Sequence, residues 1–287
     1  ETKPSVSSCH TLLDSLQHIC LMHGMEVDYY KKLFQTIGNI IKLIEKDDMP
    51  KYLLFLENAF PYMDNYNYHK GMKGIIQELK VLLKTKSIGT NSDRALLLDF
   101  QATLEIKPEK AIKLEKDALA QIENITADNA RLVSNLHANL GGLYRMNGHP
   151  DLAREHMEKS ISLLDQFNLL HINDSIPQIA NYAMFLTEQQ EPERGISELQ
   201  KLSGIIKEYH SDDCLDYAKV QETLGTIYLM TANLPQAKTH FKRAFKIYEK
   251  IWADEPEMIE AKYQEIQELY PQIGFCIGKN LSGLLTK

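Results

Sequence analysis

Five residues near the start of the sequence carry side chains that bind metal ions: Cys9, His10, His18, Cys20 and His23. A zinc site needs four ligands that converge on one point, and zinc motifs supply them as closely spaced pairs. On a helix, His18 and Cys20 face different ways because they are two residues apart, and no second close pair completes a tetrahedral site. We therefore interpret the cluster as accidental and expect neither a metal nor another cofactor.

Motifs of the common enzyme classes are also missing from the sequence. The segment 274–278 (GFCIG) lacks the lysine and the preceding strand of a phosphate-binding loop. The acidic pair Asp212-Asp213 falls in a predicted turn, where carboxylates ordinarily cap helices or face solvent. There is no nucleophile elbow and no H-E-x-x-H motif. We predict that the protein is not an enzyme.

The composition limits the classes of partner. The 287 residues are 44% hydrophobic and 25% charged, as in ordinary globular proteins, and the net charge is −7. No basic stripe is present, so we expect no direct nucleic-acid partner. No apolar run approaches the length of a membrane span, so we expect no membrane partner. The four cysteines are scattered, and we interpret them as reduced packing residues of a cytoplasmic protein. Because the chain begins at Glu1 without a leader, we interpret it as part of a longer protein.

The strongest pattern in the sequence is a repeat of 42 residues. Pro108, Pro150 and Pro192 are spaced by this interval. A column of small residues has the same spacing: Ala111, Ala153, Gly195 and Ala237. Leu140 and Tyr144 recur two periods later as Leu224 and Tyr228. Internal repeats of this length indicate stacked supersecondary units.

Each column suits a pair of helices. A proline is favoured at the first position of a helix. The prolines therefore predict where the second helix of each pair begins. The small residues allow the second helix to approach the first, and Gly141, Ala183 and Gly225 do the same from the first helix. Tyr144, Leu186 and Tyr228 fill the space between neighbouring pairs. A single pair cannot bury its apolar face alone, so the pairs must stack. The sequence predicts an all-α solenoid of antiparallel helix pairs.

The pattern is clean over about 92–259, which gives four expected repeats at 92–133, 134–175, 176–217 and 218–259. We expect degenerate helical hairpins in 1–88 and capping helices in 260–287, with an interruption at Pro271. The repeat region as a whole is expected to occupy 89–259.

The columns Leu-Gly-x-x-Tyr, then alanine, an aromatic residue and alanine, resemble the tetratricopeptide repeat. The standard unit has 34 residues, and the longer unit here is similar to the kinesin light chain type. The stretch 248–257 resembles that family's linker, although Trp252-Ala253 stands where the family has a glycine. The resemblance implies a right-handed superhelix whose first helices line a concave groove.

The resemblance also implies groove residues, because the family uses asparagine just before the Leu140/Leu224 column to hold peptide backbone. Asn139 and Asn181 match that position, whereas Leu97 and Thr223 depart from it. A side-chain amide both donates and accepts hydrogen bonds, although the two asparagines could equally be solvated polar residues. The complete set of expected groove residues is Asn139, Gly142, Arg145, Met146, Asn181, Met184, Lys219, Glu222, Thr226 and Met230.

The side chains around the asparagines would set the specificity of the groove. The methionines either form an adaptable apolar surface or cover the edge of the core. Arg145 and Lys219 either receive an acidic ligand group or are solvated charges.

We therefore expect a scaffold that binds a protein or peptide. One alternative is a domain that senses a signalling peptide and controls an effector attached upstream. Another is a helical enzyme or a phosphatase accessory protein.

Overall fold

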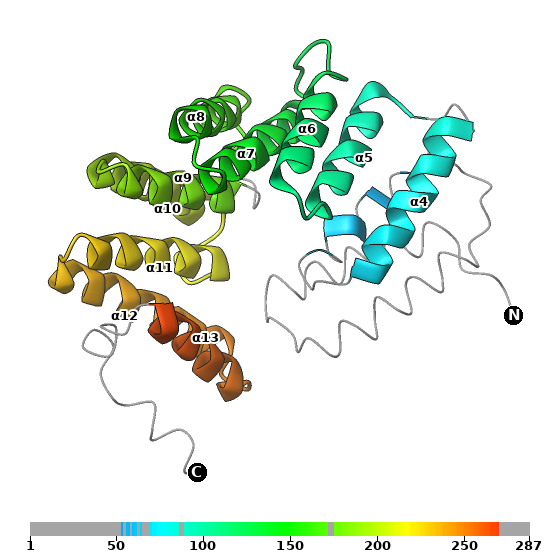
Figure 1. Cartoon of the computed structure of the whole chain (residues 1–287). Helices are drawn as coiled ribbons and strands as arrows, with labels where there is room; N and C mark the ends of the chain where they lie inside the picture. Colours follow the sequence, from blue (N-terminus) through cyan, green and yellow to red (C-terminus); the bar gives the residue numbers. More distant parts are fainter. Residues whose placement is uncertain are drawn as a thin grey trace, which may run out of the picture. The chain divides into compact units, whose positions relative to one another are not determined.

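The computed structural model describes residues 53, 56, 57, 59–61, 64, 69–85, 89–171 and 175–269. Every regular element in this part of the chain is an α-helix (Figure 1). The chain divides into two compact units, Glu1–Leu163 and Leu164–Lys287. The cysteine–histidine cluster near the N-terminus, the segment 274–278 and the cap predicted beyond Pro271 lie outside the described residues.

The first unit contains α4 (His69–Thr85), α5 (Asn91–Thr103), α6 (Pro108–Leu119), α7 (Ala130–Met146) and most of α8 (Pro150–Gln166). Helices α4 to α7 pack in chain order, each on the next. Thr90 starts α5 with a capping box, because its hydroxyl accepts a hydrogen bond from the backbone N–H of Asp93 at 3.3 Å while the Asp93 carboxylate accepts one from Thr90.

The second unit contains α9 (Ser175–Glu188), α10 (Pro192–Tyr209), α11 (Leu215–Met230), α12 (Leu234–Ile251) and α13 (Pro256–Leu269). Helices α9 and α10 form one pair and α11 and α12 the next, and α11 also packs on α9 and α10. The core between these helices is apolar and closely packed, and its largest fully buried side chains are Phe185, Tyr217, Phe241 and Tyr248.

The predicted helix starts at the prolines are confirmed. Pro108, Pro150 and Pro192 are the first residues of α6, α8 and α10, where a missing N–H costs nothing. The first helices α5, α7, α9 and α11 begin at residues 91, 130, 175 and 215. The start of the second helix in each pair therefore follows the 42-residue spacing, whereas the start of the first helix varies.

That turn has the same backbone conformation in three pairs. Gly148, Gln190 and Ala232, spaced by 42, have φ angles of 75°, 64° and 59°. The residue after each of them donates its N–H back to the first helix: His149 to Tyr144 at 2.9 Å, Glu191 to Leu186 at 2.8 Å and Asn233 to Tyr228 at 2.7 Å. This is the Schellman helix ending. It joins the two helices of these three pairs in one defined geometry.

The two helices of a pair approach each other closely at the glycine columns, as the sequence predicts. A Cβ atom at Gly195 would lie 2.7 Å from the carbonyl oxygen of Ala183 on the facing helix. One at Gly141 would lie 2.6 Å from Cγ of Met157, and one at Gly225 would lie 3.0 Å from the ring of Phe241. A Cβ at any of these positions would require the facing helix or its side chains to shift. The all-α solenoid of antiparallel helix pairs is thus confirmed.

Candidate protein-binding surface

The expected groove residues lie on first helices of both units. Asn139, Gly142, Arg145 and Met146 belong to α7 of the first unit, and the other six belong to α9 and α11 of the second unit. These side chains differ in whether they already form hydrogen bonds or ion pairs within their own unit.

Asn139 is exposed, but its amide is bound to two carboxyl groups. Its Nδ2 donates to Oδ1 of Asp99 at 2.8 Å and to Oε1 of Glu115 at 3.3 Å. Burial, reinforced by the charge of Asp99, raises the pKa of Glu115 to about 10, and burial also raises the pKa of Asp99. Glu115 therefore keeps its proton at neutral pH. The donors of Asn139 stabilise this carboxyl pair and are not available to a ligand.

The other three residues on α7 contribute little to a defined site. Met146, the last residue of the helix, is 81% exposed. A side chain added at Gly142 would meet no atom within 4 Å, so this glycine is open to solvent and is not required for packing. Arg145 is partly buried and interacts with a neighbouring residue.

In the second unit, six residues follow one face of α9 and α11. They recur at helical spacing and are exposed or half-buried, whereas Tyr182 and Leu224, which point away from this face, are buried. Since α9 and α11 are neighbours, we call this set the first-helix surface: Asn181, Met184, Lys219, Thr223, Thr226 and Met230.

Asn181 differs from its counterpart Asn139, whose amide is bound to Asp99 and Glu115. It is exposed, and no group among the described residues forms a hydrogen bond with its side chain. Met184 lies one helical turn further along the same face and is half-buried. An amide with both donor and acceptor free, beside a flexible apolar side chain, can receive a stretch of peptide backbone.

Two charged residues of α11 have partners within the unit. Lys219 forms an ion pair with Asp216 at 3.5 Å but remains half-exposed. Glu222 accepts a hydrogen bond from the Tyr248 hydroxyl at 2.5 Å and pairs with Nζ of Lys262 at 3.0 Å. Glu222 thus links α11 to α12 and α13, and this network occupies both of its carboxylate oxygens. The sequence could not reveal this, because the partners come from two other helices.

Sequence reasoning also missed a recurring histidine–tyrosine arrangement. In the pair α7/α8, His137 and His156 join through their Nδ1 atoms at 2.8 Å, and the His156 ring stacks on Tyr144 at 5.4 Å. Burial, followed by the charges of His156 and Lys159, lowers the pKa of His137 to about 4, and burial also lowers the pKa of His156. Both rings are therefore neutral at pH 7, and one nitrogen donates to the other.

The pair α11/α12 repeats this arrangement 84 residues later. His240 stacks on Tyr228 at 5.3 Å and its Nδ1 lies 2.9 Å from Oε1 of Gln221. The pair between them has Leu186 in the tyrosine column and Glu198 in the histidine column. The histidines and the tyrosines both recur at a spacing of 84 residues in the sequence. This spacing was enough to predict that the two pairs share the arrangement. Since the rings pack between the two helices of a pair, it is a packing feature.

Other kinds of site are not evident in the described part of the chain. Nowhere among those residues do three or more histidine, cysteine, aspartate or glutamate side chains gather as metal ligands do. Within the same residues, no helix combines the length and the apolar character that crossing a bilayer requires.

Comparison with known proteins places this fold in a class. Residues 175–250 match the family model described as "Tetratricopeptide repeat". Among solved structures, BtubC (BKLC) from P. vanneervenii is similar with a TM-score of 0.51 and 16% identity over 79% of this chain and 85% of that chain. Kinesin light chain TPR-like repeats from Podosopora anserina give 0.54 and 13%, over 69% of this chain and 95% of theirs.

A third structure is similar over more of the chain. A Rap protein complexed with Competence and Sporulation Factor has a TM-score of 0.51 and 16% identity, over 94% of this chain and 76% of that chain. No curated protein is significantly similar in sequence. The family match identifies residues 175–250 as tetratricopeptide repeats. The helix pairs and the similar solved structures show that the chain has the fold of such a repeat protein. In fold, the 42-residue repeats are similar to kinesin light chain repeats, in agreement with the resemblance found in the sequence. Such repeats form scaffolds that mediate contacts between proteins.

Proposed function

We propose that the protein binds an extended segment of a partner polypeptide on the first-helix surface of the second unit. The single observation that supports this most is the exposed amide of Asn181, which has no hydrogen-bond partner among the described residues. A side-chain amide can pair with the N–H and C=O of a peptide whatever its sequence. Asn181 would therefore provide affinity for backbone in general.

Specificity would come from the residues around Asn181. Met184 and Met230 offer adaptable apolar contacts, and Met230 is 43% exposed. Lys219 is half-exposed and can exchange its ion pair with Asp216 for an acidic group on the ligand. We expect the preferred segment to combine an apolar side chain with a neighbouring carboxylate.

Selection of random peptides on the purified chain, followed by fluorescence polarisation with the selected peptides, tests the proposal. Asn181→Ala should weaken binding by about fivefold to tenfold, the effect of losing one or two net hydrogen bonds. The fold should be unaffected, because alanine is a better helix former than asparagine. Gln166→Ala is the matched control, since it removes an exposed amide from a second helix. Equal affinities of Asn181→Ala and wild type would refute the assignment of the surface.

A second candidate function is a sensor, in which a bound peptide changes the conformation of the chain and thereby an attached effector. Its support is the likeness to the Rap protein, which covers 94% of this chain whereas the kinesin light chain repeats cover 69%. Small-angle scattering with and without a selected peptide separates the candidates. A sensor should change its radius of gyration on binding, and a scaffold should keep it.

A further inference from the structure

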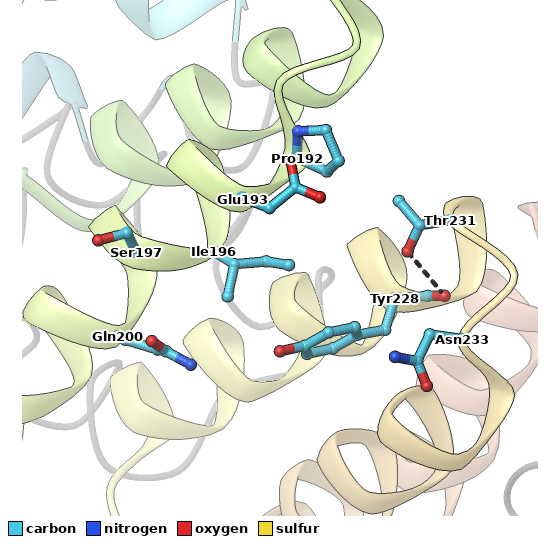
Figure 2. A pocket seen from close by; sticks show the side chains of 8 residues that line it. All are labelled: Pro192, Glu193, Ile196, Ser197, Gln200, Tyr228, Thr231 and Asn233. Carbon is cyan, nitrogen blue, oxygen red and sulfur yellow. Dashed lines mark hydrogen bonds between the residues drawn. The ribbon is translucent and has the colours of Figure 1, made fainter.

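The second unit contains a cavity that is separate from the first-helix surface. It has a volume of about 440 Å³ and is open to solvent. Figure 2 shows its lining, which comes from α10 on one side and from the corner between α11 and α12 on the other. The eight lining residues are Pro192, Glu193, Ile196, Ser197, Gln200, Tyr228, Thr231 and Asn233. Its volume lies within the range of about 300–1,000 Å³ typical of small-ligand sites.

Most of the polar side chains in this lining have no hydrogen-bond partner among the described residues. The side chains of Glu193, Ser197 and Gln200 and the hydroxyl of Tyr228 form no hydrogen bond with any described residue. The Thr231 hydroxyl donates to the backbone oxygens of Ile227 and Tyr228, so its free lone pairs can only accept. The cavity therefore offers several hydrogen-bond acceptors from both of its walls.

The charge of the lining favours a cation. Glu193 is the one acidic side chain among the eight lining residues, and none of them is basic. Arg194, its neighbour in the chain, is directed elsewhere, since it donates to Glu191 at 2.8 Å and to the Tyr182 hydroxyl at 3.1 Å. The Glu193 carboxylate thus remains available to a positively charged ligand.

Tyr228 adds an aromatic surface to the site. One face of its ring stacks on His240 at 5.3 Å, which fixes the ring in place. Burial, followed by the charge of Arg243, lowers the pKa of His240, so the stacked imidazole is neutral at pH 7 and does not repel a cation. An aromatic ring attracts a cation placed over its free face.

We propose that this cavity binds the guanidinium group of an arginine side chain from a partner polypeptide. A guanidinium is planar, carries five donors and stacks on aromatic rings. It can pair with Glu193, lie against Tyr228 and donate to acceptors on both walls at once. An ammonium group has three donors on a single point and satisfies fewer of these acceptors. The site lies outside the first-helix surface and does not depend on the function proposed for that surface.

A titration of the full chain with two matched probes tests this inference. The probes are N-acetyl-arginine N-methylamide and its citrulline analogue, which has nearly the same shape but no charge. Binding is followed by the amide signals of the ¹⁵N-labelled chain. The arginine probe should shift the signals of residues lining the cavity, and the citrulline probe should bind several times more weakly. Raising the ionic strength should weaken the arginine probe alone.

Two variants locate the interaction. Glu193→Gln should weaken the arginine probe by about threefold to fivefold, the worth of one partly exposed ion pair. Glu208→Gln neutralises an exposed carboxylate near the other end of α10 and should leave the affinity unchanged. The inference is overturned if arginine and citrulline bind equally, if both variants behave alike, or if the shifted signals lie outside the cavity.

Discussion

The contact between α9 and α10 makes a prediction in which one substitution has opposite effects at two positions of the same helix. Gly195 and Gly204 both lie inside α10. A Cβ at position 195 would stand 2.7 Å from the carbonyl oxygen of Ala183, 3.1 Å from its Cα and 3.2 Å from its carbonyl carbon. A Cβ at position 204 would meet nothing within 4 Å. Alanine therefore suits one position and not the other.

The magnitude follows from two opposing terms. Replacing glycine by alanine inside a helix stabilises it by about 1 kcal/mol, and Gly204→Ala should show this gain in full. At Gly195 the atoms in the way are backbone, which cannot rotate aside, so α9 and α10 must separate. Overpacking of this kind costs about 1–3 kcal/mol. We expect Gly195→Ala to lose up to about 2 kcal/mol of stability after the helix gain is included.

Trp252 provides the assay. It is the single tryptophan of the chain, belongs to the second unit, is 7% exposed and stacks on Tyr248 at 4.9 Å. Its fluorescence should move to longer wavelength when this unit unfolds in urea. Equal slopes of the unfolding transitions would show that midpoint differences report stability. The reasoning is refuted if Gly195→Ala is as stable as Gly204→Ala.

Two further predictions concern a turn and the carboxyl pair. Ala232→Gly should stabilise the second unit by about 0.5 kcal/mol, because the strain relieved in the left-handed conformation exceeds the cost of a more flexible unfolded chain. Urea unfolding measures this change in stability, and a less stable variant would contradict the prediction. Since the pKa of Glu115 is raised from 4.5 to about 10, its contribution to stability is complete below pH 4.5 and is lost as the pH rises toward 10. The melting temperature of Glu115→Gln should accordingly exceed that of wild type by an amount that grows from pH 6 to pH 9. A difference that does not change with pH would exclude the carboxyl group as its cause.

The sequence predicts the architecture well because the features that define a helix pair are local. A proline at the first position, a small residue three positions later and a glycine in the facing helix each act through neighbours at fixed spacing. Pro150 and Pro192 consequently start helices, and Gly195 faces Ala183. The column containing Gly148 also continues through Gln190 and Ala232, where residue type alone does not predict a positive φ.

The candidate site is less predictable, because its properties depend on partners from distant helices. Asn139 and Asn181 occupy the same column, yet Asp99 and Glu115 bind one amide and nothing described binds the other. Glu222 appears in the sequence as a groove residue, but Tyr248 and Lys262 draw it into a network among three helices. Periodicity identifies the position of a residue on its helix. It does not identify which neighbours satisfy its polar groups.

The Schellman turn within three of the pairs has a practical consequence for engineering the chain. Its backbone hydrogen bonds tie the end of the first helix to the start of the second, and an inserted residue would break them. The connection from α8 to α9 contains the same turn at Asn168, with φ 54°. No residue of 120–129 or 210–214 has a positive φ; residues 120–129 follow the short helix α6, whereas 210–214 follow the longer α10. A fluorescent or affinity tag therefore belongs between pairs, in 120–129, where the chain already accommodates extra length.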